Sequence, residues 1–188
     1  MYRKSTHKHI LTAFLAVISL ILSLVKMAIP FIPPFLTLDF AFIPIFFALL
    51  IVGYKSALMV SLLKNILSFL LITHEPIGSV ANFIVEIIFV SSIYYFYKKG
   101  TKSAILGGII GTILVTIVMS IVNYFVLLPL YGYIMDLTDI LNNIKLIITY
   151  GIVPFNLIKG IFSIVLFFAA KRLAVKMPKS ITGKYHTN

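Results

Sequence analysis

Residues Ser103–Met135 read SAILGGIIGTILVTIVMSIVNYFVLLPLYGYIM and contain no charged side chain. About 20 consecutive apolar residues are enough to cross the hydrocarbon core of a bilayer. A second uncharged segment runs from His9 to Val25. The chain of 188 residues is 61% hydrophobic and only 11% charged, which leaves too few polar residues to cover a soluble domain of this size. The composition therefore predicts an integral membrane protein.

The hydrophobic pattern predicts an all-α membrane protein with six transmembrane helices. These helices are expected at residues 9–27, 40–52, 56–73, 78–97, 104–128 and 150–170, within a single integral membrane domain over residues 1–188. No small-residue cleavage site follows the first span, so we expect that it is not a cleaved signal peptide. The second span is short, because thirteen residues cover only about 20 Å of helix. A short span should leave space at one membrane face.

Charged residues gather between the predicted spans and divide unequally between the two sides of the membrane. Twelve basic residues fall on one side, namely Arg3, Lys4, Lys8, Lys55, Lys98, Lys99, Lys102, Lys171, Arg172, Lys176, Lys179 and Lys184. The other side receives one clear cation, Lys145, together with Asp39, Glu75, Asp136 and Asp139. Because positively charged loops stay in the cytoplasm, both termini are predicted to be cytoplasmic.

The first extracellular loop, residues 28–39, combines prolines with an apolar composition. It reads AIPFIPPFLTLD, and Pro30, Pro33 and Pro34 exclude a regular helix. Irregular backbone at membrane depth must pack on protein or line a cavity. The residues of this loop alone leave two interpretations open, a tightly packed connector and a lid over a cavity.

Polar and ionisable residues lie inside the predicted spans, below their outer ends. At a rise of about 1.5 Å per residue, Asn82, Asn123 and Asn156 lie roughly 6–9 Å deep. Glu86 and Lys159 lie roughly 12–13 Å deep. The spacings Asn82–Glu86 (i, i+4) and Asn156–Lys159 (i, i+3) each place two side chains on one helix face. If these faces converge, they form a cavity that opens to the outside and has a charged floor.

Ionisable residues inside a membrane span are costly and are candidates for a function. A structural role is the alternative, because Glu86 and Lys159 can pair with each other, and an Asn that joins two helices contributes about 0.6 kcal/mol on average. The matched depths beneath an apolar loop favour a ligand site for the set as a whole. Lys64 stays open between a ligand contact, pairing with a loop and snorkelling toward the interface.

Several functional classes lack the residues that they need. The chain has no cysteine, and its four histidines lie near the chain ends or in a loop, so we expect no metal site. No catalytic triad, HExxH motif or P-loop is present, and we expect no enzyme activity, no catalytic residue and no cofactor. The net charge of +11 is divided among short clusters between the spans, which argues against a nucleic-acid partner.

Aromatic residues near the polar layer can surround an apolar or aromatic ligand body. They are Phe31, Phe35, Phe40, Phe83, Tyr124 and Tyr131. Together with the amide, acid and amine groups of the layer, they favour a flat, neutral heterocycle that is rich in hydrogen-bonding groups.

Several of these segments resemble one known family. KMAIPFIPPFLTLDFAFIP, from Lys26 to Pro44, is similar to the first loop of the riboflavin-specific substrate-binding (S) component of energy-coupling factor (ECF) transporters. The resemblance extends over most of the chain and includes Lys64-Asn65, ANFIVE at 81–86, Asn123-Tyr124, PLY at 129–131 and PFNLIKG at 154–160.

The resemblance implies a high-affinity riboflavin-binding subunit of the bacterial cytoplasmic membrane, with a transmembrane coupling subunit and two cytoplasmic ATPases as partners. It implies that the first loop and the later helices hold riboflavin near the extracellular side. The ligand contacts expected on this basis are Leu38, Asp39, Phe40, Asn82, Glu86, Asn123, Tyr131, Asn156 and Lys159. Members often carry a small-xxx-small motif on the first helix for docking the coupling subunit, and Thr12 and Ala16 have that spacing.

Physical chemistry alone leaves the ligand and the class open, and three alternatives remain. The first is an S component for another vitamin or precursor, which co-purified flavin absorbance would distinguish. The second is a small membrane enzyme acting on lipid, with Glu86 and Lys159 as acid and base, which predicts turnover by the isolated chain. The third is a structural subunit without a ligand.

Overall fold

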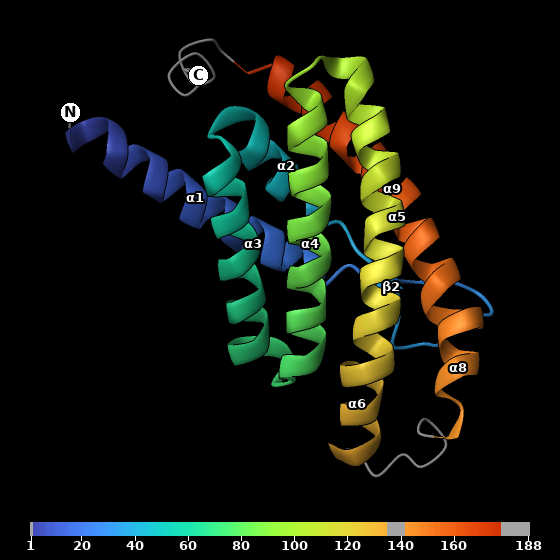
Figure 1. Ribbon diagram of the computed structural model, residues 1–188. Helices are drawn as coiled ribbons and strands as arrows, with labels where there is room; N and C mark the ends of the chain where they lie inside the picture. The colour runs from blue at the N-terminus through green and yellow to red at the C-terminus, as the bar shows by residue number, and fades with distance from the viewer. Residues whose placement is uncertain (1, 135–141, 178–188) are drawn as a thin grey trace.

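The computed structural model describes residues 2–134 and 142–177, and the regular secondary structure of these residues is helical apart from one short β ribbon (Figure 1). The long helices are α1 (Tyr2–Ser23), α3 (Tyr54–Ser68), α4 (Pro76–Tyr97), α5 (Thr101–Val122) and α9 (Val153–Val175). The shorter ones are α2 (Phe42–Ile51), α6 (Leu128–Ile134) and α8 (Ile144–Ile147). Helix α4 packs along α5, α5 along α9, and α1 against α3.

Three π-helical segments extend these helices. They are η1 (Phe69–Thr73) after α3, η2 (Asn123–Leu127) between α5 and α6, and η3 (Ile148–Ile152) between α8 and α9. All three lie toward the end of the molecule that carries α6 and α8, away from the first turn of α1 (Figure 1). Such segments are rare and frequently mark functional sites.

Five helices within the described residues are long and apolar enough to cross a bilayer. They cover Thr6–Ser23, Tyr54–Thr73, Pro76–Tyr97, Thr101–Tyr133 and Ile144–Val175. The remaining predicted span, the second one at 40–52, corresponds to α2, which has 10 residues and is therefore about 15 Å long, half the thickness of a hydrocarbon core of about 30 Å. The prediction of a helical, multi-span membrane protein is confirmed, and α2 is short, as its sequence predicts.

The last two spans extend beyond their predicted bounds of 104–128 and 150–170 because the π-helical segments join neighbouring helices. Pro129 is the second residue of α6, which begins at Leu128 directly after η2, and the missing N–H of a proline is tolerated in the first turn of a helix. The first helix instead ends at Ser23, before its predicted end at Met27, because Met27 belongs to the β ribbon.

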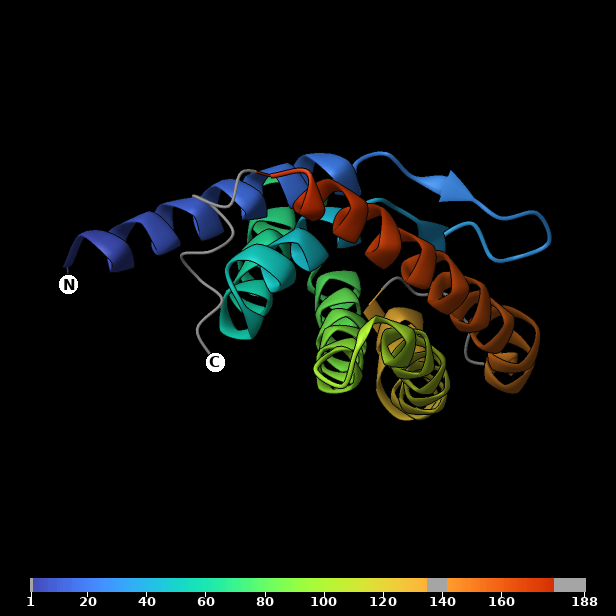
Figure 2. The same cartoon turned by 90° about the horizontal axis from the view of Figure 1, so that it is seen from above.

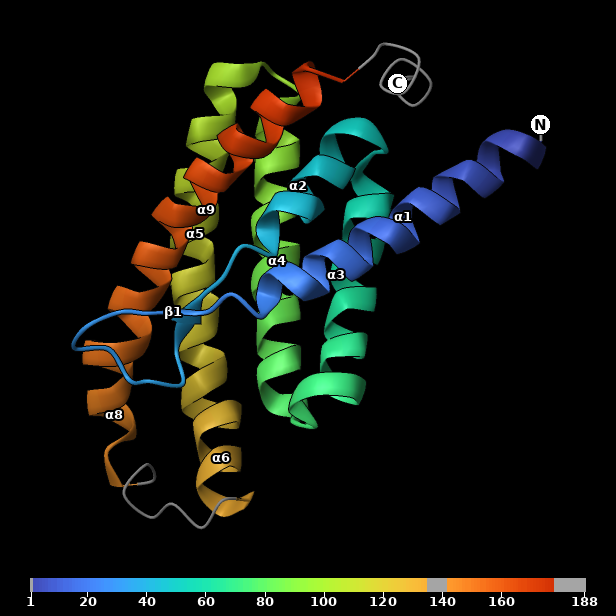
Figure 3. The ribbon, with the colours of Figure 1, turned by 180° about the vertical axis from the view of Figure 1, so that it is seen from behind.

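The proline-rich loop is closed by a ribbon of two short antiparallel strands, β1 (Met27–Ala28) and β2 (Thr37–Leu38). Met27 pairs with Leu38 and Ala28 with Thr37, which leaves the three prolines outside the paired residues. A Cβ built on Gly151 in η3 would lie 3.1 Å from ring carbons of Pro33. Part of the loop therefore packs on protein, and it crosses the face of α9 and α5 that Figure 3 shows.

The core centres on α2, whose side chains pack between α3, α4 and α9. The Phe46 ring stacks on Phe42, with a centroid distance of 5.2 Å, and meets Phe167 of α9 edge-on at 5.4 Å. The Phe89 ring of α4 lies 5.7 Å from that of Phe42. Helix α2 lies in the half of the molecule nearer the last turn of α9 (Figure 3), so this core leaves the other half of the helix bundle for a cavity.

Candidate functional site

A cavity of about 330 Å³ lies between the first loop and the helices α3, α4, α5 and α9, and it reaches η1, η2 and Tyr131 of α6. This volume falls within the range of about 300–1,000 Å³ that is usual for pockets of drug-sized ligands. The loop contributes Phe35, Leu36, Thr37 and Asp39, so it covers the cavity as well as packing on η3. The loop thus combines both roles that the sequence left open.

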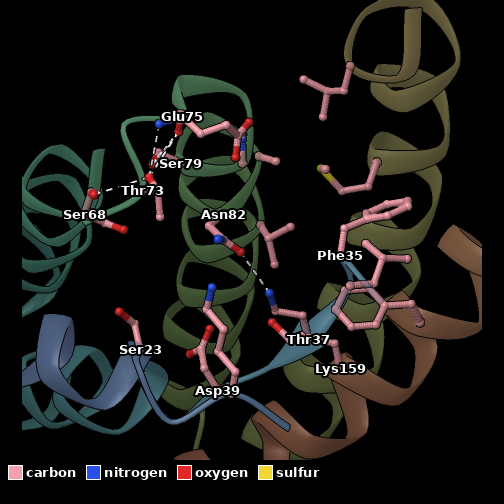
Figure 4. Close-up of a pocket in the computed structure, with 18 of the residues that line it drawn as sticks. Ser23, Phe35, Thr37, Asp39, Ser68, Thr73, Glu75, Ser79, Asn82 and Lys159 are labelled. Carbon is pink, nitrogen blue, oxygen red and sulfur yellow. Dashed lines mark hydrogen bonds between the residues drawn. The ribbon is translucent and has the colours of Figure 1, made fainter. Parts of the chain in front are cut away.

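Four of the five polar residues whose depth was predicted, Asn82, Asn123, Asn156 and Lys159, line this cavity. Asp39 of the first loop lines it too. The Nζ atom of Lys159 on α9 donates to Oδ1 of Asn82 on α4, at 3.1 Å (Figure 4). Helix rotation, which the sequence does not determine, therefore brings the faces of α4 and α9 together.

Two amides of the wall have an orientation that the backbone fixes. Nδ2 of Asn123 donates to the carbonyl of Met119 at 2.7 Å, and Nδ2 of Asn156 donates to that of Ile152 at 2.8 Å. A carbonyl oxygen only accepts hydrogen bonds, so each amide must turn its nitrogen toward the backbone. Both side chains consequently present their Oδ1 atoms as acceptors toward the cavity that they line.

Lys159 is a buried amine, only 7% exposed. Among the residues that the structure describes, the salt bridge is that of Lys64 with Glu86, so the ammonium of Lys159 lacks a carboxylate at salt-bridge distance. Its ammonium lies 5.5 Å from the centre of the Phe155 ring. A buried ammonium is costly unless hydrogen bonds satisfy its protons. Because an ammonium has three N–H donors, Lys159 can donate to a ligand while it holds Asn82.

Glu86 does not line the cavity, which corrects its predicted place in the floor beneath Asn82. It is buried between α3 and α4, where its carboxylate accepts from Lys64 Nζ at 2.5 Å, Ser61 Oγ at 2.6 Å and Asn65 Nδ2 at 2.7 Å. The alternative of a Glu86–Lys159 ion pair is wrong for the same reason, since Lys64 is the cation that pairs with Glu86.

Two predicted ligand contacts in the first loop also lie off the cavity wall. Leu38 in β2 is buried, and the ring of Phe40 packs edge-on against Phe162, with centroids 5.6 Å apart. The alternation of side chains along β2 explains this difference, because Thr37 faces the cavity and its neighbour Leu38 faces away.

Of the aromatic residues expected around a ligand, Phe35 and Tyr131 line the cavity, with ring centroids 6.5 Å apart. The other four do not line it. Phe31 is fully exposed in a left-handed conformation (φ 66°), Tyr124 is exposed beside Phe125, and Phe83 lines a separate apolar groove between α3 and α4.

Glu75 is a cavity residue that the sequence analysis placed only among the outer loop residues. Its Oε1 atom caps α4 by accepting from the Gly78 N–H at 2.9 Å, and it also accepts from the Tyr131 hydroxyl at 2.6 Å. The available signal was an acidic residue directly before Pro76, which is typical of a helix N-terminus. Glu75 lies at the margin of the cavity (Figure 4), and its hydrogen bonds link the start of α4 to α6.

The structure contradicts the prediction that Thr12 and Ala16 form a docking surface. Thr12 is 4% and Ala16 only 1% exposed, because α1 packs with this face against α2 and α3 of its own chain. Small residues four apart permit a close helix approach, but they do not specify the partner. Helix α1 instead exposes larger apolar side chains, including Phe14 and Ile21, and its first turns project from the body (Figure 2).

The sequence and the fold are both similar to those of known transport proteins. Residues 7–170 match the family model described as ECF transporter, substrate-specific component. The chain is 48% identical over 172 residues to the riboflavin transporter RibU of Staphylococcus aureus (strain TCH60), covering 89% of this chain and 91% of the relative. It is 32% identical over 166 residues to the riboflavin transporter FmnP of Bacillus subtilis (strain 168), covering 85% and 87%.

A solved structure described as "Structure and mechanism of the S component of a bacterial ECF transporter" superimposes with a TM-score of 0.77 at 43% sequence identity. It covers 92% of this chain and 99% of the other. The family suggested by the sequence motifs is confirmed, and it is a family of transport components rather than enzymes. The chain belongs to the substrate-specific components of ECF transporters.

Proposed function

We propose that this chain is a high-affinity riboflavin-binding subunit for vitamin uptake. The observation that carries the proposal is the polar wall of the cavity, in which Lys159 and Asn82 offer donors while Asn123 and Asn156 offer acceptors. Riboflavin needs both kinds of partner, since its ring carbonyls accept hydrogen bonds and its imide N–H and ribityl hydroxyls donate them. The names of the two bacterial relatives support this choice of ligand.

The proposed contacts follow from the chemistry of the wall. Lys159 and Asn82 donate to acceptors of riboflavin, while the Oδ1 atoms of Asn123 and Asn156 accept from its N–H or O–H groups. Tyr131 supplies an aromatic surface for the flat ring, on which a ring contact contributes about 0.5–1.5 kcal/mol beyond area burial.

The first loop completes the proposed site. Asp39 lines the cavity directly, and its Oδ1 accepts from the Ala41 N–H at 2.8 Å, which fixes the carboxylate at the start of α2. Leu38 and Phe40 fix the loop on the side away from the cavity, because Leu38 pairs with Met27 in the β ribbon and Phe40 packs on Phe162.

The proposed membrane arrangement is a single domain in the bacterial cytoplasmic membrane with both termini in the cytoplasm. The charge asymmetry of the loops supports it, although Asp136, Asp139, Lys179 and Lys184 lie outside the described residues. The family description supports a coupling module as partner, which we propose to consist of a transmembrane subunit and two cytoplasmic ATPases.

The absence of cysteine makes this orientation directly measurable. A membrane-impermeant thiol reagent applied to intact cells is expected to label Lys145→Cys and to spare Lys99→Cys. The opposite labelling pattern would contradict the proposed orientation without touching the proposed ligand.

Riboflavin binding tests the function. Quenching of flavin fluorescence on titration of purified protein is expected to give a Kd well below micromolar, with flavin absorbance in protein purified from riboflavin-containing medium. A Kd no tighter than micromolar, or tighter binding of a different vitamin, would contradict the proposal.

A further inference from the structure

A buried polar network joins α3 to α4 next to the cavity. Lys64 and Asn65 of α3 and Glu86 of α4 belong to it, with Ser61 one turn before Asn65. Lys64 is only 2% exposed, and it is the one charged member of the network that lines the cavity. The ligand contacts proposed for Lys159 and Asn82 do not involve this network.

The hydrogen bonds of the network nearly exhaust its donors and acceptors. Asn65 uses both amide hydrogens, one to the Ser61 carbonyl at 2.9 Å and one to Oε2 of Glu86, and its Oδ1 accepts from Lys64 at 3.1 Å. Ser61 donates to the same Oε2. Both oxygens of Glu86 are therefore occupied.

Lys64 is the member of this network that keeps an unused hydrogen-bond donor. Its Nζ donates to Glu86 and to Asn65, which engages two of the three N–H groups of an ammonium. The remaining N–H belongs to the member that borders the cavity, so a ligand can accept it. The carboxylate of Glu86 neutralises the Lys64 charge at 2.5 Å, so an uncharged ligand atom is a sufficient acceptor.

We propose that Lys64 is a ligand-contacting residue of the riboflavin site and that Glu86 is a positioning residue that acts through it. This inference rests on the proposed riboflavin function. Lys64 donates its remaining N–H to an uncharged oxygen or nitrogen acceptor of the vitamin, while Glu86, fixed by Ser61 and Asn65, holds the ammonium in place.

A purely structural ion pair makes a different prediction, and a paired substitution separates the two. Removing one partner leaves a buried unpaired charge and destabilises the protein, whereas replacing both partners by neutral residues of similar volume is often harmless to stability. In Lys64→Met/Glu86→Gln, we expect a melting temperature of the ligand-free protein close to that of wild type. We expect riboflavin binding to be weaker by about tenfold or more, because the donor is lost.

A matched control exists on the same two helices. The Tyr54 hydroxyl of α3 and Ser91 Oγ of α4 lie 2.9 Å apart, away from the cavity lining. In Tyr54→Phe/Ser91→Ala, which removes this other polar link, riboflavin affinity is expected to stay within twofold of wild type. An equal loss in this control would mean that binding responds to any loosening of α3 against α4, and it would overturn the proposal.

A Kd within threefold of wild type in a well-folded Lys64→Met/Glu86→Gln protein would likewise overturn it and leave the pair a structural one. If that double variant does not fold, Glu86→Asp keeps both charges and withdraws the carboxylate by one methylene. Its Kd is then expected to rise at least about threefold, and an unchanged Kd would refute the positioning role. Failure of wild-type protein to bind riboflavin would instead refute the proposed function itself.

Discussion

Replacing Lys159 by methionine should change stability and binding in opposite directions. Methionine keeps an unbranched side chain of similar length but removes the ammonium that lies buried on α9 with no carboxylate within salt-bridge distance among the described residues. An unpaired buried charge costs several kcal/mol of solvation. The ligand-free Lys159→Met protein is therefore expected to melt at the same temperature as wild type or higher.

Binding should respond the other way, because the ligand loses a charged donor. Hydrogen bonds to charged groups contribute about 1.5–3 kcal/mol, which corresponds to a loss of about 10- to 100-fold in affinity. The lost bond to Asn82 adds little, because the Oδ1 atom that Lys159 releases borders the cavity and can be hydrated there.

Fluorescence titration with riboflavin and thermal unfolding of the same detergent-solubilised samples measure both quantities. Lys145→Met, which alters an exposed lysine of α8, serves as the control and should change neither. A Kd of Lys159→Met within threefold of wild type would refute the role of the ammonium in binding. A fall in melting temperature together with unchanged affinity would show that Lys159 serves the fold.

Two further substitutions test the margin of the cavity and the packing of α5. Tyr131→Phe removes the 2.6 Å hydrogen bond that holds the Tyr131 ring against Glu75 at the cavity margin, and riboflavin should bind about three- to tenfold more weakly in fluorescence titrations because the ring is less well fixed. Gly107→Ala should lower the unfolding free energy by about 1–3 kcal/mol in thermal unfolding, because its Cβ would lie 2.8 Å from the backbone oxygen of Ser92.

Each of these substitutions has a neighbour as its control. Tyr133→Phe changes an exposed ring on the same helix as Tyr131 and should leave the Kd unchanged. Gly111 faces the same helix α4, but a Cβ added there would lie 3.2 Å from Ser92 Cβ and 3.4 Å from Phe89 Cδ2. Gly111→Ala should therefore lower the unfolding free energy less than Gly107→Ala does. Equal effects of Tyr131→Phe and Tyr133→Phe, or a larger loss in Gly111→Ala, would contradict the structural explanation.

Depth within a span could be predicted from the sequence, and the direction of each side chain only in part. Counting residues along the helices placed Asn82, Asn123, Asn156 and Lys159 at levels where the structure gathers them around one cavity. The same counting placed Glu86 beneath Asn82, although Glu86 faces α3. An i, i+4 spacing defines a shared face only to within the width of that face, and the neighbouring helix decides which edge of it is buried.

The sequence also does not determine which of several possible residues or helices a given side chain contacts. Glu86 had two lysines at its own depth, and only the packing of α3 beside α4 makes Lys64 the one that pairs. Similarly, the small residues Thr12 and Ala16 correctly indicate a close helix contact but not that it lies within the chain. The role of Glu75 follows from its geometry, since the carboxylate that caps α4 also reaches the hydroxyl of Tyr131.

The short helix α2 also bears on how well the subunit insulates the membrane. Its rings of Phe42 and Phe46, packed against Phe89 and Phe167, fill the half of the bundle that the cavity does not occupy. Among the described residues, these rings belong to a continuous apolar cluster, which opposes the entry of water and ions from the cavity into that half of the bundle. An isolated subunit of this design is expected to sit in an energised membrane without dissipating its proton gradient, even when no vitamin is bound.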